Sequence, residues 1–111
     1  MTAYKKWDVI LVPFPFTDLS SFKKRPALIL SPDQYNISGD VVIAFITSNL
    51  QSIDKFGDYQ FQQWKQAGLP LPSKLRMKFA TVNNEIIIKK IGHLDSLDQN
   101  SIHQLVHNFF D

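Results

Sequence analysis

DVVIAFIT (residues 40–47) decides the fold, because this apolar run rich in β-branched side chains is typical of a buried β-strand. The apolar run RPALIL (residues 25–30) precedes it, and Pro26 favours an extended backbone at Arg25. The segment between them, residues 31–39, contains Pro, Asp, Asn and Gly, which are typical of turns. The two runs predict an antiparallel pair of strands that brings Arg25 and Thr47 to the same end of a sheet.

Further strands are expected on both sides of this pair. Trp7 to Val12 is a compact apolar run that Pro13 and Pro15 should end. Shorter or later strands are predicted at residues 58–61, 75–82 and 85–91, and residues 62–67 form at most a short helix. Asn83-Asn84 predicts a tight hairpin turn between the last two strands.

The apolar period changes from two to 3.6 residues after Asp95. Ile102, Leu105, Val106 and Phe109 recur at helical spacing, and Asp95 or Ser96 can cap the helix. Five or six short strands followed by one helix predict a mainly β domain over residues 1–111. We expect a strongly curved antiparallel sheet, an SH3-like barrel, with a C-terminal α-helix packed on it.

Composition excludes several classes of function. The chain has 111 residues, a formal net charge of +2 and no Cys, so disulfides, thiolate zinc sites and a cysteine nucleophile are excluded. No P-loop, dinucleotide-binding or GxSxG motif occurs, and we expect no cofactor. Without a signal-peptide pattern or an apolar run of bilayer length, the chain is expected to be cytoplasmic and not bound to a membrane.

Positive charge is densest at Lys23, Lys24 and Arg25, where a polar loop meets the second strand. A solvated loop would explain these cations, but Arg25 beside Pro26 has a stiff backbone and can bind a phosphate with two donors. Phe16 in the same loop either packs beneath the loop or offers a stacking face to a base.

Lys74, Arg76 and Lys78 alternate on a predicted strand, which places all three on one face. They either keep an edge strand soluble or form a basic groove that follows a phosphate backbone.

Polar residues Thr47, Ser48 and Asn49 follow the strongest strand. Their side chains either bond the local backbone or contribute to a binding site at the end of the sheet.

His103 and His107 have the helical spacing of a metal-binding pair, but no third ligand is evident, and we predict no metal site. His93 is a possible general base that the sequence does not bring near Arg25.

The order of these blocks resembles the PemK/MazF family of toxin endoribonucleases from bacterial toxin–antitoxin systems. The resemblance rests on DVILVPFPFTDLSSFKKRPALILS, VVIAFITSN, LPLPSKLRMKFAT and EIIIKKIGHL. It implies an SH3-like barrel with a C-terminal helix, acting as a homodimer and inhibited by a cognate antitoxin. It also implies metal-independent cleavage of single-stranded RNA at short sequences, for which we expect attack by the substrate's 2′-hydroxyl.

The same resemblance assigns the family's catalytic arginine to Arg25 and its catalytic threonine to Thr47. The loop from Phe16 to Lys24 matches the family's mobile loop at the substrate groove. Residues expected to contact RNA are Phe16, Lys23, Lys24, Ser48, Asn49, Lys74, Arg76 and Lys78. Two positions depart from the usual pattern: Trp7 replaces the glycine before Asp8, and Met77 replaces the acid before Lys78.

Two alternatives remain open from the sequence. The first is a non-catalytic toxin that poisons DNA gyrase, as the related CcdB-type proteins do, although the tail IHQLVHNFFD lacks the Trp-Gly-Ile end associated with that activity. The second is a nucleic-acid-binding barrel without catalytic activity.

Overall fold

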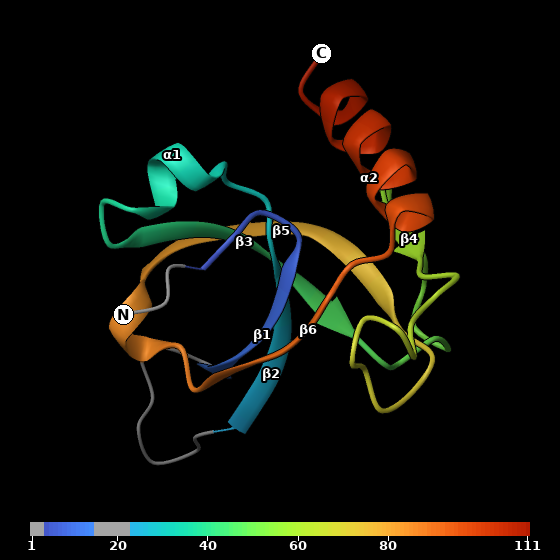
Figure 1. Ribbon diagram of the computed structural model, residues 1–111. Helices are drawn as coiled ribbons and strands as arrows, with labels where there is room; N and C mark the ends of the chain where they lie inside the picture. Colours follow the sequence, from blue (N-terminus) through green and yellow to red (C-terminus); the bar gives the residue numbers. More distant parts are fainter. Residues whose placement is uncertain (1–3, 15–22) are drawn as a thin grey trace.

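Six strands form one antiparallel sheet in the order β4-β5-β3-β2-β1-β6 in the computed structural model, which describes residues 4–14 and 23–111. The strands are β1 (Asp8–Phe14), β2 (Lys23–Ile29), β3 (Asp40–Thr47), β4 (Tyr59–Gln60), β5 (Lys74–Asn83) and β6 (Lys89–His93). The helices are α1 (Asp33–Asn36), the 3₁₀ turn η2 (Asn84–Ile86) and α2 (Ser96–Phe109). Figure 1 shows the sheet curled into a half-barrel with α2 at one end. The predicted mainly β fold with a C-terminal helix is confirmed.

The first three long strands form where the apolar runs predict them. β3 has the predicted bounds, and β2 begins two residues earlier than expected, at Lys23. β1 continues through Pro13 to Phe14, so the prediction that proline ends this strand is wrong. Pro13 is tolerated because β6 pairs with β1 only from Asp8 to Leu11, which leaves β1 at the sheet's edge beyond that point.

The predicted hairpin between the last two strands is wrong. Asn83 instead caps the 3₁₀ turn η2, and its side-chain oxygen accepts a hydrogen bond of 2.9 Å from Glu85 N. The chain then crosses to the opposite edge of the sheet, where β6 pairs with β1 rather than with β5. The open edge of β1 thereby gains a partner, and Ile87 is buried on the way.

Two apolar clusters, one on each face of the sheet, explain why its central strands are almost entirely apolar. The outer cluster packs beneath α2 and includes Val9, Leu28, Ala44, Ile46, Leu75 and Ile102. The inner cluster lies within the curl and includes Ile10, Val12, Ala27, Ile29, Ile43 and Val82. In β2, Ala27, Leu28 and Ile29 alternate between the two clusters, as strand geometry requires.

The helix α2 is attached to the sheet through a buried carboxylate. Asp95 caps the helix as predicted, accepting a bond from Leu97 N. Asp98 in the first turn is fully buried and accepts hydrogen bonds from the Tyr59 hydroxyl at 2.5 Å and from the backbone N–H groups of Gln62 and Gln63. Burial of the Tyr59 phenol, together with the Asp98 carboxylate, raises the pKa of Tyr59 to about 12. Within the described residues, no helix is long and apolar enough to cross a membrane.

Candidate functional site

Arg25 and Thr47 are brought to the same end of the sheet by the register of β2 and β3. Ala27 pairs with Phe45, and the same register carried two residues further would place Arg25 opposite Thr47. The pairing ends at Ala27, next to Pro26, which has no N–H to donate to a ladder. Arg25 and Thr47 therefore lie at the same end of the sheet, as the sequence predicts, but beyond the last paired residues of β2 and β3.

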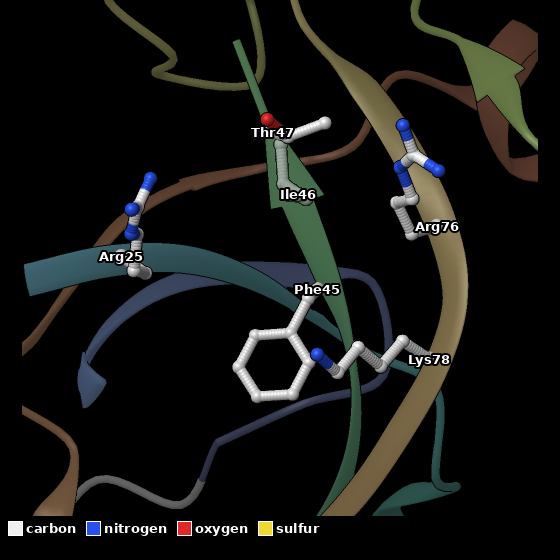
Figure 2. A pocket seen from close by; sticks show the side chains of 6 residues that line it. All are labelled: Arg25, Phe45, Ile46, Thr47, Arg76 and Lys78. Carbon is white, nitrogen blue, oxygen red and sulfur yellow. The ribbon is translucent and has the colours of Figure 1, made fainter. Parts of the chain in front are cut away.

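A pocket of ≈ 230 Å³ occupies this end of the sheet. Figure 2 shows Arg25 from β2 and Arg76 from β5 on opposite sides of the end of β3. The pocket is lined by Arg25, Phe45, Ile46, Thr47, Arg76 and Lys78. Three cationic side chains and one hydroxyl around a shallow pocket provide hydrogen-bond donors and positive charge suited to an anion such as a phosphate.

Arg76 and Lys78 reach the pocket because of an irregularity in β5. Ala44 pairs with Phe79 but Ile46 pairs with Leu75, so the three residues of β5 from Arg76 to Lys78 lie opposite Phe45 alone. Bulges of this kind bend a strand and redirect its side chains, and they are frequent next to active sites. The sequence identified both cations but gave no signal of the bulge.

The Thr47 hydroxyl is fixed by its own loop. Thr47 Oγ1 accepts a hydrogen bond of 3.1 Å from Asn49 N, and Asn49 Oδ1 accepts one of 3.2 Å from Gln51 N. These are the local backbone bonds that polar residues make at the end of a strand. The bond to Asn49 N uses a lone pair of Thr47 Oγ1 and leaves its proton to be donated. Ser48 and Asn49 are exposed on the same turn.

Lys74 lies apart from this pocket. Its side chain is only 4 % exposed, and Lys74 Nζ lies 2.8 Å from Asp54 Oδ1, 3.1 Å from Ser52 O and 3.7 Å from Asp58 Oδ2. The hydrogen bond from Lys74 and its positive charge lower the pKa of Asp54. The buried ammonium therefore joins β5 to the loop that follows β3.

Arg76 participates in the same network while also lining the pocket. Arg76 Nη2 donates to Ser52 Oγ at 2.5 Å and to Ile53 O at 3.3 Å, and Arg76 Nη1 lies 3.5 Å from Asp58 Oδ2. Asp58 is the central acid of the cluster, with a side chain only 6 % exposed. The sequence analysis missed Asp54 and Asp58, although two acids in a polar loop before three alternating cations were a usable signal.

The remaining predicted contacts lie around this site or outside the described residues. Lys23 and Lys24 are exposed and pair with Phe14 and Pro13 at the start of β2. Phe16 and the loop at residues 15–22 lie outside the described residues.

The histidines lie away from Arg25. His93 Nδ1 is 2.7 Å from the buried Asp8 Oδ1, which also lies 3.3 Å from Lys90 Nζ. His103 and His107 line a separate pocket beside Trp7. Among the residues that the structure describes, no three His, Cys, Asp or Glu side chains are grouped as metal ligands would be.

Trp7 has a left-handed backbone conformation, with φ of +77°. This conformation suits glycine, the residue usual at this position in the family that the sequence resembles, and it is costly for a residue with a Cβ. The backbone here is held by hydrogen bonds from Trp7 N to Ile29 O and from Leu94 N to Trp7 O. The geometry typical of glycine is therefore kept, and the tryptophan ring packs against the outer cluster.

Comparison with known proteins places the chain in a family. The family model for the PemK-like, MazF-like toxin of type II toxin–antitoxin systems matches residues 5–110. No curated protein matches the sequence.

Solved structures share the fold at low sequence identity. An endoribonuclease from a mycobacterial species, in complex with its cognate antitoxin, is 16 % identical with a TM-score of 0.74, and the match covers 97 % of this chain and 93 % of that one. MazF from Deinococcus radiodurans is 14 % identical with a TM-score of 0.74, covering 99 % and 98 % of the two chains. The Mycobacterium tuberculosis toxin MazF-mt6 is 21 % identical with a TM-score of 0.71, covering 94 % and 96 %.

Proposed function

Because the chain belongs to the PemK-like, MazF-like toxins of type II toxin–antitoxin systems, we propose that it is a sequence-specific endoribonuclease that cleaves single-stranded RNA without a metal ion. The observation that carries this proposal is the pocket formed where β2 and β3 separate, with Arg25 and Thr47 on its walls. In this proposal the pocket holds the phosphate at which the RNA is cleaved.

The reaction uses the 2′-hydroxyl of the RNA as its nucleophile. This oxygen attacks the adjacent phosphorus and gives its proton to water, while the bond from phosphorus to the 5′ oxygen breaks and that oxygen takes a proton from water. The products are a 2′,3′-cyclic phosphate and a 5′-hydroxyl end. The principal task of the protein is to stabilise the charge that builds up on the phosphoryl oxygens.

Arg25 and Thr47 have different roles in this mechanism. Arg25 presents two charge-assisted donors to the phosphoryl oxygens, and its guanidinium stays protonated throughout. Thr47, whose oxygen is fixed by Asn49 N, donates its hydroxyl proton to the same oxygens or orients the 2′-hydroxyl. Arg76 and Lys78 add positive charge from the opposite wall.

The proposed partners follow from the family and from its relatives. The mycobacterial endoribonuclease was solved with its cognate antitoxin, and a Deinococcus radiodurans MazF was solved with MazE. We extend this to a cognate antitoxin for the present chain, and we propose that the toxin is a homodimer acting in the cytoplasm.

The decisive test is cleavage of single-stranded RNA in the presence of EDTA, which removes divalent metals. The wild-type chain should cut the RNA and leave a cyclic phosphate. Arg25→Ala should lower kcat on the order of 10²–10³-fold, because removing one donor to the developing charge costs about 2.7–4 kcal/mol.

Lys24→Ala is the matched control, since Lys24 is an exposed cation next to Arg25 that does not line the pocket. It should change KM modestly and leave kcat nearly unchanged. Intact RNA with the wild-type chain, or equal cutting by Arg25→Ala, would overturn the proposal.

A further inference from the structure

Phe56, in the loop between β3 and β4, is an exposed aromatic residue beside the candidate site. It is 83 % exposed, yet its ring stacks on Phe109 of α2, with centroids 6.1 Å apart and an interplanar angle of 30°. Phe109 in turn packs against Phe79, with ring centroids 5.8 Å apart. The Phe56 ring is therefore supported by other aromatic rings while most of its surface faces solvent.

The loop that carries Phe56 is held in place by two cations of β5. Lys74 Nζ bonds the Ser52 carbonyl oxygen and the Asp54 carboxylate, and Arg76 donates to the Ile53 carbonyl oxygen. These bonds attach the backbone just before Phe56 to a rigid strand. Unlike a mobile loop residue, Phe56 would not have to be ordered when a ligand binds.

A tight turn then fixes the direction of the ring. Lys55 N donates to Asp58 Oδ2 at 2.9 Å and Asp58 N donates to Lys55 O at 3.0 Å, so the two residues close the turn around Phe56. Gly57 has φ of +91°, and a Cβ there would lie 2.6 Å from Met77 Cγ. Glycine is thus required where the turn passes close to β5.

A second pocket, of ≈ 640 Å³, lies beside Phe56 and shares two lining residues with the candidate site. Its lining includes Lys55, Phe56, Asp58 and Phe109, and it also includes Arg76 and Lys78, which line the pocket of Arg25 and Thr47. A strand of RNA passing from one pocket to the other would keep its phosphates beside Arg76 and Lys78. The base next to the cleaved bond would then arrive at Phe56.

We propose that Phe56 is a stacking platform for a base of single-stranded RNA, at a nucleotide adjacent to the phosphate held by Arg25. This inference rests on the proposed function for the identity of the nucleic acid. Every base has a π-face, so stacking here strengthens binding without selecting one base. Phe56 would position the strand, and Arg25 and Thr47 would act on its phosphate.

The test uses 2′-O-methyl RNA hexamers, which cannot be cleaved by 2′-hydroxyl attack, with the fluorescent base 2-aminopurine at each position in turn. Wild-type protein should quench the fluorescence most strongly at one position, since stacking on an aromatic ring quenches this base. Phe56→Ala should abolish that quenching and weaken binding roughly 5- to 150-fold, the range expected for loss of one base–aromatic stack. Phe56→Trp should retain both.

Ile53→Ala is the matched control, because Ile53 is an apolar residue of the same loop and is 86 % exposed. Its substitution should leave quenching and affinity unchanged. Equal behaviour of Phe56→Ala and Ile53→Ala, or no binding of the hexamers to the wild-type chain, would overturn the inference.

Cleavage is measured separately on unmodified RNA, where Phe56→Ala should raise KM with kcat within about threefold of wild type. A wild-type chain that stacks the hexamers but cuts no RNA would refute the proposed function and leave the stacking role supported. A chain that cuts RNA with no dependence of KM on Phe56 would refute only the inference.

Discussion

At the scale of single residues, Trp7 is the position where a backbone requirement and a side-chain requirement conflict. The backbone needs a positive φ so that Trp7 can bond both Ile29 and Leu94, while the ring contributes to the outer cluster. A left-handed conformation costs a non-glycine residue about 1–3 kcal/mol.

Comparison of Trp7→Ala with Trp7→Gly separates the cost of the positive φ from the stabilisation by the packed ring. Both variants lose the ring, which should destabilise the protein by about 3 kcal/mol or more, but only the glycine relieves the backbone. Trp7→Gly should therefore be more stable than Trp7→Ala by about 1 kcal/mol in urea unfolding. Trp64, a partly buried tryptophan without a positive φ, is the control. There glycine should be less stable than alanine, and the same order at both positions would contradict the explanation.

At the scale of elements, local sequence predicted the strands but not all of their partners. β3 and the N-cap of α2 agree with the sequence because apolar runs and capping residues act locally. The partner of β6 could not be predicted in this way, because it depends on how far the whole sheet curls before the edge of β1 is reached. The pair Asn83-Asn84 is as compatible with a hairpin turn as with the cap of a 3₁₀ helix, so the sequence alone does not distinguish them.

In the candidate site, too, some features could be predicted from the sequence and others could not. Arg25 and Thr47 could be brought together from two strands and one turn, because antiparallel pairing follows from chain order. The buried position of Lys74 could not be inferred, since alternation places side chains on a face without indicating what covers it. The covering loop supplies Asp54 and Asp58, which pair with the buried Lys74 ammonium.

Removing the Lys74 ammonium should release this loop from β5. Lys74→Met leaves the nearly buried Asp58 carboxylate with one cation fewer, which should cost about 3 kcal/mol in the free energy of unfolding. Amide hydrogen exchange should increase over residues 52–58, and adding Asp58→Asn should recover part of the lost stability. A Lys74→Met protein with wild-type exchange in this loop would show that the cluster does not hold it.

The contact between β4 and α2 predicts a pH dependence of stability. The pKa of Tyr59 is raised to about 12 in the folded protein from an ordinary value of 10.0. The folded state therefore binds the phenol proton more tightly, so this stabilisation is fully present below pH 10 and is lost as the pH rises through 12. Absorbance at 295 nm should show one tyrosine that ionises near pH 12, and that step should be missing in Tyr59→Phe.

The same substitution tests the energy of the contact. Tyr59→Phe removes the strongest neutral donor to the buried Asp98 carboxylate and should destabilise the fold by about 1.5–3 kcal/mol at neutral pH. Tyr35→Phe, at an exposed tyrosine, should have little effect. Equal stability of the two variants would mean that the Tyr59 hydroxyl does not help to hold α2.

At the scale of the whole molecule, the net charge of +2 conceals an uneven distribution of cations. Arg25, Arg76 and Lys78 line one pocket, and Lys23 and Lys24 are exposed on the strand that leads to it. Lys74 lies nearby but is neutralised by Asp54 and Asp58. Arg76 also lies 3.5 Å from Asp58 and is partly neutralised in the same cluster. An RNA strand at this end of the sheet should therefore meet between two and four effective positive charges.

The salt dependence of RNA binding measures the number of effective positive charges that the RNA meets. For a single strand, the logarithm of the binding constant falls against the logarithm of salt concentration with a slope of about −0.7 per phosphate neutralised, which gives about −1.4 to −2.8 here. Lys24→Ala should make the slope shallower by about 0.7, whereas Lys65→Ala should leave it unchanged because Lys65 is an exposed cation that lines neither of the two pockets. Fluorescence anisotropy of labelled, non-cleavable RNA from about 50 to 200 mM salt provides the measurement. A slope near zero would place the RNA elsewhere on the molecule, and a slope that changes with Lys65→Ala but not with Lys24→Ala would contradict the role assigned to Lys24.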